Sequence, residues 1–237
     1  MTQHKTDVCI VGGGPAGMIL ALLLAHKGIK TLVLEKNADF SREYRGEVLM
    51  PRFTQMMKQI GLADWLLTLK HLELPFGELF FKHIRVGKID FTQTCPEVPY
   101  ALWMPQVVLL NGLFAKAKQF PAFDLWFGAS AKSLIQNNGV TGVVVQKGAE
   151  TIEVSSKVVV GADGRFSTVL KDGGFEMEYE NYSFDILWFT IPKPKAYQNT
   201  FKVMLAPKRS FLFLPKYPDE IQVGILVAPR QLAELRN

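Results

Sequence analysis

Three glycines near the amino terminus have the spacing of a phosphate-binding turn. Gly12, Gly14 and Gly17 form the pattern G-x-G-x-x-G between the apolar run 7–11 and the apolar stretch 18–26. In such a turn one glycine allows the tight reversal, one lets the backbone approach a pyrophosphate, and one lets the following helix pack against the strand. The pyrophosphate then lies at the amino end of the helix, where N–H groups are unpaired and the helix dipole is positive.

An acidic residue follows the glycines at the distance that a dinucleotide site requires. Glu35 ends a second apolar run, 30–35, about 20 residues after the glycines. A carboxylate there accepts hydrogen bonds from an adenosine ribose and repels a 2′-phosphate. Because strand, turn, helix, strand and acid stand in order, the pattern favours a dinucleotide site over a glycine-rich turn without ligand. This pattern does not choose between FAD and NAD.

The apolar pattern predicts the elements that position these residues. The runs 7–11 and 30–35 are typical of buried parallel strands, and the stretch 18–26 is expected to form the helix between them. These elements make a βαβ unit, whose crossover is right-handed. Further helices are expected over 51–70 and 106–118. The apolar positions of the first of these are Met56, Met57, Ile60 and Trp65, with both methionines filling core.

Strands dominate the rest of the pattern. Alternation over 76–91 predicts one or two strands, and 140–146 is expected to pair with 151–154 in a hairpin about Gly148 that leads into 157–161. After residue 175 aromatic residues and prolines become frequent, which marks a second, sheet-rich region. Its strands are expected at 184–191, 200–205, 210–214 and 221–227, and a helix is expected to begin near Gln231.

Composition excludes several classes of protein. The chain has 237 residues, of which 48% are hydrophobic and 21% charged, with a formal net charge of +5. This balance is that of an ordinary globular protein and excludes wholesale disorder. The basic residues are scattered, which favours a solvated surface over a nucleic-acid groove. No apolar run reaches the roughly 18 residues of a membrane span and no signal-peptide cleavage site follows the stretch 18–26, so we expect a cytoplasmic protein.

The cysteines and histidines do not suggest a metal site. Cys9 and Cys95 lack the spacing of metal ligands, and the four histidines form no close cluster. Cys9 stands inside the apolar run 7–11, so we expect it to be a buried small hydrophobic residue.

A second motif resembles that of a known family. Gly161-Ala162-Asp163-Gly164-Arg165-Phe166-Ser167 follows an apolar strand and resembles the GADGxxS motif of the class A FAD-dependent monooxygenases related to p-hydroxybenzoate hydroxylase. The segment 44–52 resembles the first-helix region of that family, and Pro105-Gln106 resembles the start of its flavin-facing helix. These matches cover residues 1–170, and the remaining residues resemble the family only in pattern.

The resemblance implies an α/β fold and a set of cofactor contacts. A Rossmann-like FAD-binding domain of the glutathione-reductase type would span 1–175, with a strand-rich insertion at about 76–104. The start of an antiparallel, β-rich substrate domain would span 176–237. The implied cofactor-binding residues are Gly12, Gly14, Pro15, Ala16, Gly17, Glu35, Lys36, Arg45, Gln106, Asp163 and Gly164.

Three of these residues have particular implied roles and competing interpretations. Arg45 and Gln106 would lie along the pyrophosphate, ribityl chain and flavin edge. Asp163 would reach the phosphate region and help to position NAD(P)H. The alternatives are a surface arginine, a polar residue at a helix start, and a turn former before Gly164.

The implied activity is that of a flavoprotein oxidoreductase. NAD(P)H reduces FAD, O₂ adds to give a flavin hydroperoxide, and one oxygen atom passes to an aromatic or polycyclic organic substrate. The protein binds, orients and excludes water, so no catalytic side chain is assigned. Five apolar residues of the second region are candidates for a substrate-binding surface, and packing of the sheet explains their presence at least as well. They are Trp188, Phe189, Met204, Phe211 and Phe213.

The chain departs from the family at two places. Leu170 stands where members carry an arginine, three residues after the motif serine, and Lys171 follows it. A lysine one place along substitutes in part but does not make a bidentate contact. The family's later Gly-Asp-Ala-Ala-His motif is absent, so we expect a fold that is incomplete at the carboxyl end.

Other interpretations therefore stay open. The chain could be a non-catalytic FAD-binding fragment, or one completed by a partner chain or by self-association, since an unpaired sheet edge invites association. It could also be another flavin enzyme, of the isoprenoid reductase or halogenase type. Residues 187–192 resemble the halogenase motif W-x-W-x-I-P but lack its first tryptophan. The substrate, the choice of NADH or NADPH and the oligomeric state are not specified by the sequence.

Overall fold

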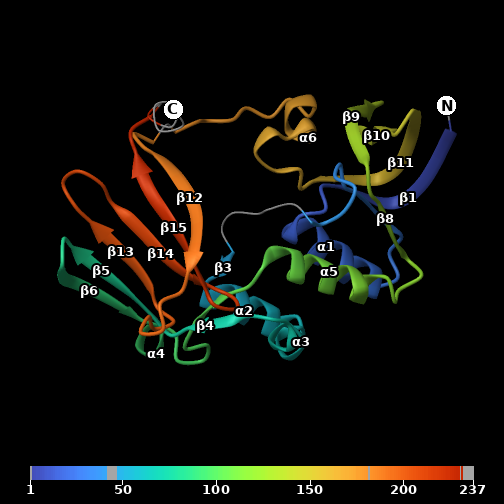
Figure 1. Cartoon of the computed structure of the whole chain (residues 1–237). Helices are drawn as coiled ribbons and strands as arrows, with labels where there is room; N and C mark the ends of the chain where they lie inside the picture. The colour runs from blue at the N-terminus through green and yellow to red at the C-terminus, as the bar shows by residue number, and fades with distance from the viewer. Residues whose placement is uncertain (1, 42–46, 181, 230, 232–237) are drawn as a thin grey trace. The chain divides into compact units, whose positions relative to one another are not determined.

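The chain folds into two compact units. The structure, a computed structural model, describes residues 2–41, 47–180, 182–229 and 231 (Figure 1). Residues 1–43 and 106–178 form unit 1, and residues 44–105 and 179–237 form unit 2. This division differs from the expected boundaries at 175 and at 76–104, because the inserted segment begins earlier and joins the carboxy-terminal strands instead of unit 1.

Unit 1 is built on a six-stranded sheet in the order β8-β2-β1-β11-β10-β9. The first four strands of this order are mutually parallel, and β10 and β9 continue the sheet in antiparallel fashion. The strands are β1 (Thr2–Val11), β2 (Thr31–Leu34), β8 (Phe123–Trp126), β9 (Ala129–Gln136), β10 (Val140–Lys147) and β11 (Glu150–Gly161).

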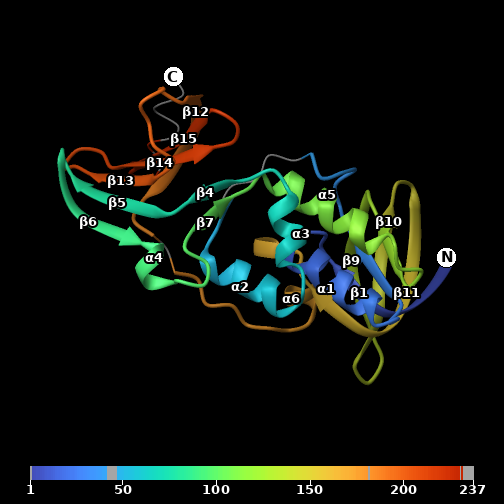
Figure 2. The ribbon, with the colours of Figure 1, turned by 90° about the horizontal axis from the view of Figure 1, so that it is seen from below.

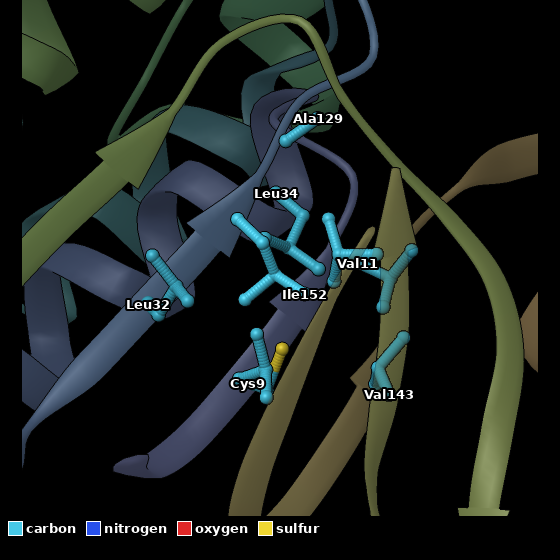
Figure 3. Close-up of a cluster of buried hydrophobic side chains, with 9 residues drawn as sticks. Cys9, Val11, Leu32, Leu34, Ala129, Val143 and Ile152 are labelled. Atoms are coloured by element: carbon cyan, nitrogen blue, oxygen red, sulfur yellow. The ribbon is translucent and has the colours of Figure 1, made fainter. Parts of the chain in front are cut away.

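Alternate residues of β1 bury opposite faces of this sheet. Cys9 and Val11 pack with Leu32 and Leu34 of β2 against apolar side chains of β10 and β11, including Val143 (Figure 3). Cys9 is fully buried, which confirms the expectation that it is a buried small hydrophobic residue. This burial raises the pKa of the Cys9 thiol to about 12. The next residue along, Ile10, faces the opposite side, where helix α1 (Pro15–His26) lies.

Two helices cover that second face of the sheet. Helix α1 packs against β2 and against α5 (Gln106–Ala117), and the two helices lie side by side (Figure 2). The buried residues of the two helices are Gly17, Met18, Ala21, Leu22, Ala25, Leu109, Leu110, Leu113 and Ala117. The expected βαβ unit over 7–35 is therefore confirmed, with α1 beginning at Pro15 instead of residue 18.

The sequence pattern missed part of unit 1. β8 and β9 were not expected, and the predicted strands 151–154 and 157–161 are one continuous strand, β11. β11 is continuous because β1 extends back to Thr2 and pairs with it from Ile152 to Gly161. The first half of β1 is polar and exposed, so its hydrophobicity does not indicate a strand.

Unit 2 contains a second six-stranded sheet, in the order β12-β15-β14-β13-β5-β6. β13 pairs with β5 in parallel, which joins the inserted segment to the carboxy-terminal strands and gives unit 2 its composition. The other pairings are antiparallel. The strands are β5 (Phe76–Phe81), β6 (Ile84–Asp90), β12 (Asp185–Pro192), β13 (Phe201–Leu205), β14 (Phe211–Lys216) and β15 (Glu220–Val227), which confirms the strands expected there.

Short elements complete unit 2. A three-stranded sheet has the order β3-β7-β4, and three short helices accompany it. Their bounds are β3 (Val48–Leu49), β4 (Leu72–Leu74), β7 (Ala101–Trp103), α2 (Pro51–Gln59), α3 (Ala63–Thr68) and α4 (Phe91–Thr94). A single-turn helix η1 (Gly164–Phe166) and α6 (Thr168–Asp172) belong to unit 1.

The single helix expected over 51–70 was wrong. The chain forms α2 and α3 with a break at Gly61, whose φ of 73° lies in the left-handed region that favours glycine. Met57 is buried as expected, but Met56 and Ile60 are exposed because they lie on the outer side of α2 and at its end. The helix expected near Gln231 falls almost wholly outside the described residues.

Candidate functional site

The two sequence motifs meet at the carboxyl ends of neighbouring parallel strands. Val11 and Gly161 are register partners at the ends of β1 and β11. The glycine turn begins directly after Val11, and the GADG turn begins at Gly161. A backbone hydrogen bond of 2.7 Å from Ala162 N–H to Val11 O links them. Ligands of open α/β sheets bind at this edge.

Gly12 permits the close contact between the two turns. Its φ is 109°, a conformation that side chains rarely adopt. A Cβ atom at this position would lie 2.3 Å from Ala162 O and 2.8 Å from Asp163 N. Its N–H also donates to Leu34 O at 2.8 Å, which ties the turn to β2. The first glycine of the motif is therefore required by the packing of the second motif against it.

Gly17 brings helix α1 against its own turn. A Cβ atom at Gly17 would lie 2.1 Å from Gly12 O and 3.3 Å from the Ile10 side chain. No side chain would fit in that space without moving backbone. Gly17 thus has the helix-packing role expected of the third glycine of the motif.

Gly14 differs from the other two glycines because the space beside it is open. It is the N-cap of α1, with extended backbone at φ −71° and ψ 178°, and a Cβ atom there would meet nothing within 4 Å in the part of the chain that the structure describes. No side chain caps the helix start, and no acidic residue stands in its first turn. Pro15, at the first helical position, and the exposed Ala16 leave this end uncovered.

This helix start fits the pyrophosphate of a dinucleotide. The first N–H groups of a helix have no carbonyl partner within it, and an anion satisfies them while meeting the positive end of the dipole. Open space beside Gly14 lets the anion approach the backbone. Pyrophosphate oxygens are the chemical match for such a set of donors.

The Glu35 carboxylate lies beside this turn and is held by protein N–H groups. Its side chain is 7% exposed. Oε2 accepts a hydrogen bond of 3.0 Å from Gly13 N–H. Oε1 accepts from the backbone N–H of Asn37 at 2.9 Å and from its side-chain Nδ2 at 2.6 Å. Lys36, between them, is exposed.

Gly13 and Asn37 are residues that the sequence analysis missed. Two features of the sequence could have indicated them. Gly13 is a glycine between Gly12 and Gly14 that the motif does not require, and Asn37 is an amide residue two positions after Glu35. Both become meaningful only when the turn and the end of β2 are seen together.

Asp163 organises the turn between β11 and α6. Its Oδ1 accepts a hydrogen bond of 2.6 Å from the Ser167 hydroxyl, and its Oδ2 accepts one of 2.7 Å from Thr168 N–H. Ser167 in turn accepts from Leu170 N–H at 2.9 Å and caps α6. Gly164 follows with φ 79°. The structure thus places Asp163 in a turn-forming role, and a cofactor contact by its carboxylate stays a prediction.

This geometry predicts different outcomes for two substitutions of Asp163. Asp163→Ala removes the acceptors of Ser167 and Thr168 and is expected to lower the free energy of unfolding by about 1–2 kcal/mol. Asp163→Asn keeps an oxygen for Thr168 N–H, and its amide can donate to the Ser167 oxygen, so a loss below about 1 kcal/mol is expected. Urea unfolding followed by circular dichroism measures both. Equal losses for the two variants would contradict the assignment.

The remaining predicted cofactor residues are placed less fully. Gln106 is the first residue of α5, whose buried face packs against α1. Arg45 lies outside the described residues. Among the described residues, no group of three or more His, Cys, Asp or Glu side chains could hold a metal ion.

The aromatic residues proposed as a substrate surface divide between two faces of the unit 2 sheet. Cross-strand partners share a face, and the register pairs Phe189 with Val223, Val223 with Phe213, and Phe211 with Met204. Phe211 and Phe213 are stacked, with their ring centroids 6.1 Å apart.

Trp188 belongs to the opposite face of that sheet. It stands next to Phe189 on β12, and its ring covers Gly224, where a Cβ atom would lie 2.7 Å from the ring. The expected group of five therefore reduces to Phe189, Met204, Phe211 and Phe213.

Comparison with known proteins bears on this geometry. A family model described as "FAD binding domain" matches residues 5–224. The chain is 32% identical over 221 residues to a 6-methylpretetramide 4-monooxygenase of Streptomyces rimosus, covering 92% of this chain and 52% of the relative. It is 45% identical over 64 residues to a 1H-pyrrole-2-carbonyl-[peptidyl-carrier protein] chlorinase of Pseudomonas fluorescens, covering 27% of this chain and 14% of the relative.

A solved structure has the same fold. The p-nitrophenol 4-monooxygenase of Pseudomonas putida DLL-E4 superposes with a TM-score of 0.88 at 20% identity, over 100% of this chain and 61% of that protein. The chain thus spans about half the length of the Streptomyces rimosus relative and less than two thirds of the Pseudomonas putida protein. The family match covers nearly the whole chain and agrees with the two motif turns, so the chain belongs to the FAD binding domain family of class A flavoprotein monooxygenases.

Proposed function

We propose that the chain is the FAD-binding part of a cytoplasmic monooxygenase that hydroxylates an aromatic or polycyclic organic substrate with NADH or NADPH and O₂. The observation that carries the proposal is the start of α1. Its donors are uncapped and the space beside Gly14 is open, while the GADG turn closes against Gly12. This combination of free N–H donors, open space and two adjoining motif turns supports a ligand at that end.

The residues of unit 1 bind and orient the cofactor in this proposal. N–H groups at the start of α1 hold the pyrophosphate, and Glu35 accepts a hydrogen bond from the adenosine ribose. Asp163 and Gly164 shape the second turn beside them, and Lys36, Arg45 and Gln106 contribute along the cofactor. When bound, FAD supplies the electron transfer and oxygen chemistry that amino-acid side chains do not.

Unit 2 takes the substrate-binding role. The face that carries Phe189, Met204, Phe211 and Phe213 offers stacked and adjacent apolar side chains to an aromatic ring. The activity after which the Streptomyces rimosus relative is named, that of a 4-monooxygenase, supports oxygenation as the reaction. Within the described residues no helix is long and apolar enough to cross a membrane.

A flavin halogenase is the second candidate, favoured by the short match to a chlorinase. When the halogenase motif is aligned on Ile191 and Pro192, its two tryptophan positions fall on Leu187 and Phe189, so the second tryptophan is missing as well as the first, which corrects the resemblance noted above. Monooxygenation therefore remains the better supported reaction.

A visible absorption spectrum tests the proposal. The purified chain is incubated with FAD, desalted and scanned, and we expect a retained yellow flavin band. The loaded chain is then assayed for NAD(P)H oxidation with candidate aromatic compounds, with and without chloride. A protein that never retains FAD would contradict the proposed function and leave a fragment that needs a partner chain for binding. A chlorinated product would favour the halogenase instead.

A further inference from the structure

The backbone around Glu35 is held by hydrogen bonds to neighbouring segments of the sheet. Glu35 N–H donates to Trp126 O, and Glu35 O accepts from Ala129 N–H, both at 2.9 Å. Asn37 O accepts from Gly128 N–H at 2.9 Å. Residues 35–37 are therefore fixed to the turn between β8 and β9. These hydrogen bonds set the position of the backbone that carries the carboxylate and the Asn37 amide.

The hydrogen bonds to the carboxylate are unevenly divided between its two oxygens. An ionised carboxylate has about four acceptor positions, two on each oxygen. The N–H and Nδ2 of Asn37 fill both positions on Oε1. Gly13 N–H fills one position on Oε2. Among the residues that the structure describes, these donors leave one acceptor position, on Oε2, for a hydroxyl donor.

Gly13 is glycine because of this carboxylate. A Cβ atom at Gly13 would lie 3.0 Å from both Cβ and Oε2 of Glu35. Those distances are tighter than ordinary van der Waals contact, so a side chain at Gly13 would require the Glu35 side chain to shift by a few tenths of an ångström. The residue stands at a variable position of the G-x-G-x-x-G pattern, and the phosphate-binding role of the motif does not explain it.

We infer that Asn37 and Gly13 are positioning residues that hold Glu35 so that one acceptor position on Oε2 faces the ribose of FAD. This inference rests on the proposed function. Asn37 sets the affinity for the dinucleotide through Glu35. Since an acceptor-only carboxylate takes a hydroxyl hydrogen and repels a phosphate, the arrangement selects for an unphosphorylated ribose at this position.

Two substitutions of Asn37 separate hydrogen bonding from packing. Asn37→Ala removes the Nδ2 donor, so the Glu35 carboxylate must be ordered when FAD binds, and we expect binding to weaken about tenfold. Asn37→Asp keeps the size and shape but places a second carboxylate against Glu35, so a larger loss than that of the alanine variant is expected. Asn111→Asp, at an exposed position on α5, is the matched control and should leave the FAD dissociation constant unchanged.

A double-mutant cycle shows whether Asn37 acts through Glu35. In a Glu35→Ala background, Asn37→Ala is expected to have no further effect on the FAD dissociation constant, because the carboxylate that Asn37 positions is absent. The apo chains of all variants are compared by amide hydrogen exchange at Gly13. Protection of that N–H should be lost in Glu35→Ala, which removes its acceptor.

The outcomes decide the inference separately from the proposed function. Binding by Asn37→Asp that equals wild type would overturn it, since packing alone would then explain Asn37. Additive losses in the cycle, or a Gly13 amide that stays protected in Glu35→Ala, would overturn it as well. If the wild-type chain binds no FAD, the proposed function fails, and the positioning role for FAD fails with it.

Discussion

Gly14→Ala is expected to abolish FAD retention while leaving the fold intact. A Cβ atom at Gly14 meets no atom of the described residues within 4 Å, and the backbone there is extended, so alanine fits this turn. Alanine is a poorer N-cap than glycine but restricts the unfolded chain more, and the two effects offset to within about 1 kcal/mol. The same methyl group would occupy the space through which a pyrophosphate approaches the helix start. We expect FAD affinity to fall by at least about a hundredfold, which is about 2.7 kcal/mol.

Titration with FAD and urea unfolding of the apo chain measure the two quantities independently. Gly87→Ala in unit 2 is the matched control, since its Cβ atom would make an ordinary 3.6 Å contact with Leu79. It should leave the FAD affinity unchanged and alter the free energy of unfolding by no more than about 1 kcal/mol. A Gly14→Ala chain that binds FAD as tightly as wild type would show that the open helix start is not the binding site.

The sequence predicted the elements whose own hydrophobic residues are sufficient to indicate a strand or a helix. The buried half of β1, the strand β2 and helix α1 each show their burial in their own residues, and the family resemblance is confirmed by the match to residues 5–224. The polar half of β1 was missed because its partner, not its hydrophobicity, makes it a strand. The break at Gly61 was missed because one glycine inside an apolar pattern does not by itself end a helix.

The hydrophobic pattern could not predict which distant segments pair as strands. The parallel pairing of β5 with β13 joins residues 76–81 to 201–205, and nothing local in either strand specifies it. The same limit applies to the site. Glycine spacing identified Gly12, Gly14 and Gly17, whereas the roles of Gly13 and Asn37 depend on contacts with Glu35. Trp188 was grouped with Phe189 by type, although neighbours along a strand face opposite ways.

Gly17→Ala is expected to destabilise unit 1 severely, against the trend of helix propensity. Alanine in place of glycine inside a helix ordinarily stabilises by about 1 kcal/mol. Here the added Cβ atom would lie 2.1 Å from the carbonyl oxygen of Gly12, so α1 must move away from its own turn. Overpacking of this kind costs about 1–3 kcal/mol or more. A contact with rigid backbone falls at the upper end, and we expect a net loss of about 2–3 kcal/mol.

Urea unfolding of the apo chain gives this loss without any ligand, and Gly14→Ala serves as its counterpart three residues earlier. The two variants add the same methyl group to the same turn. Gly17→Ala is expected to lose stability and, as a result, FAD binding. Gly14→Ala is expected to lose FAD binding alone. If Gly17→Ala were as stable as wild type, the tight packing of α1 against the Gly12 carbonyl would be wrong. The geometric basis for assigning separate roles to the three glycines would then fail.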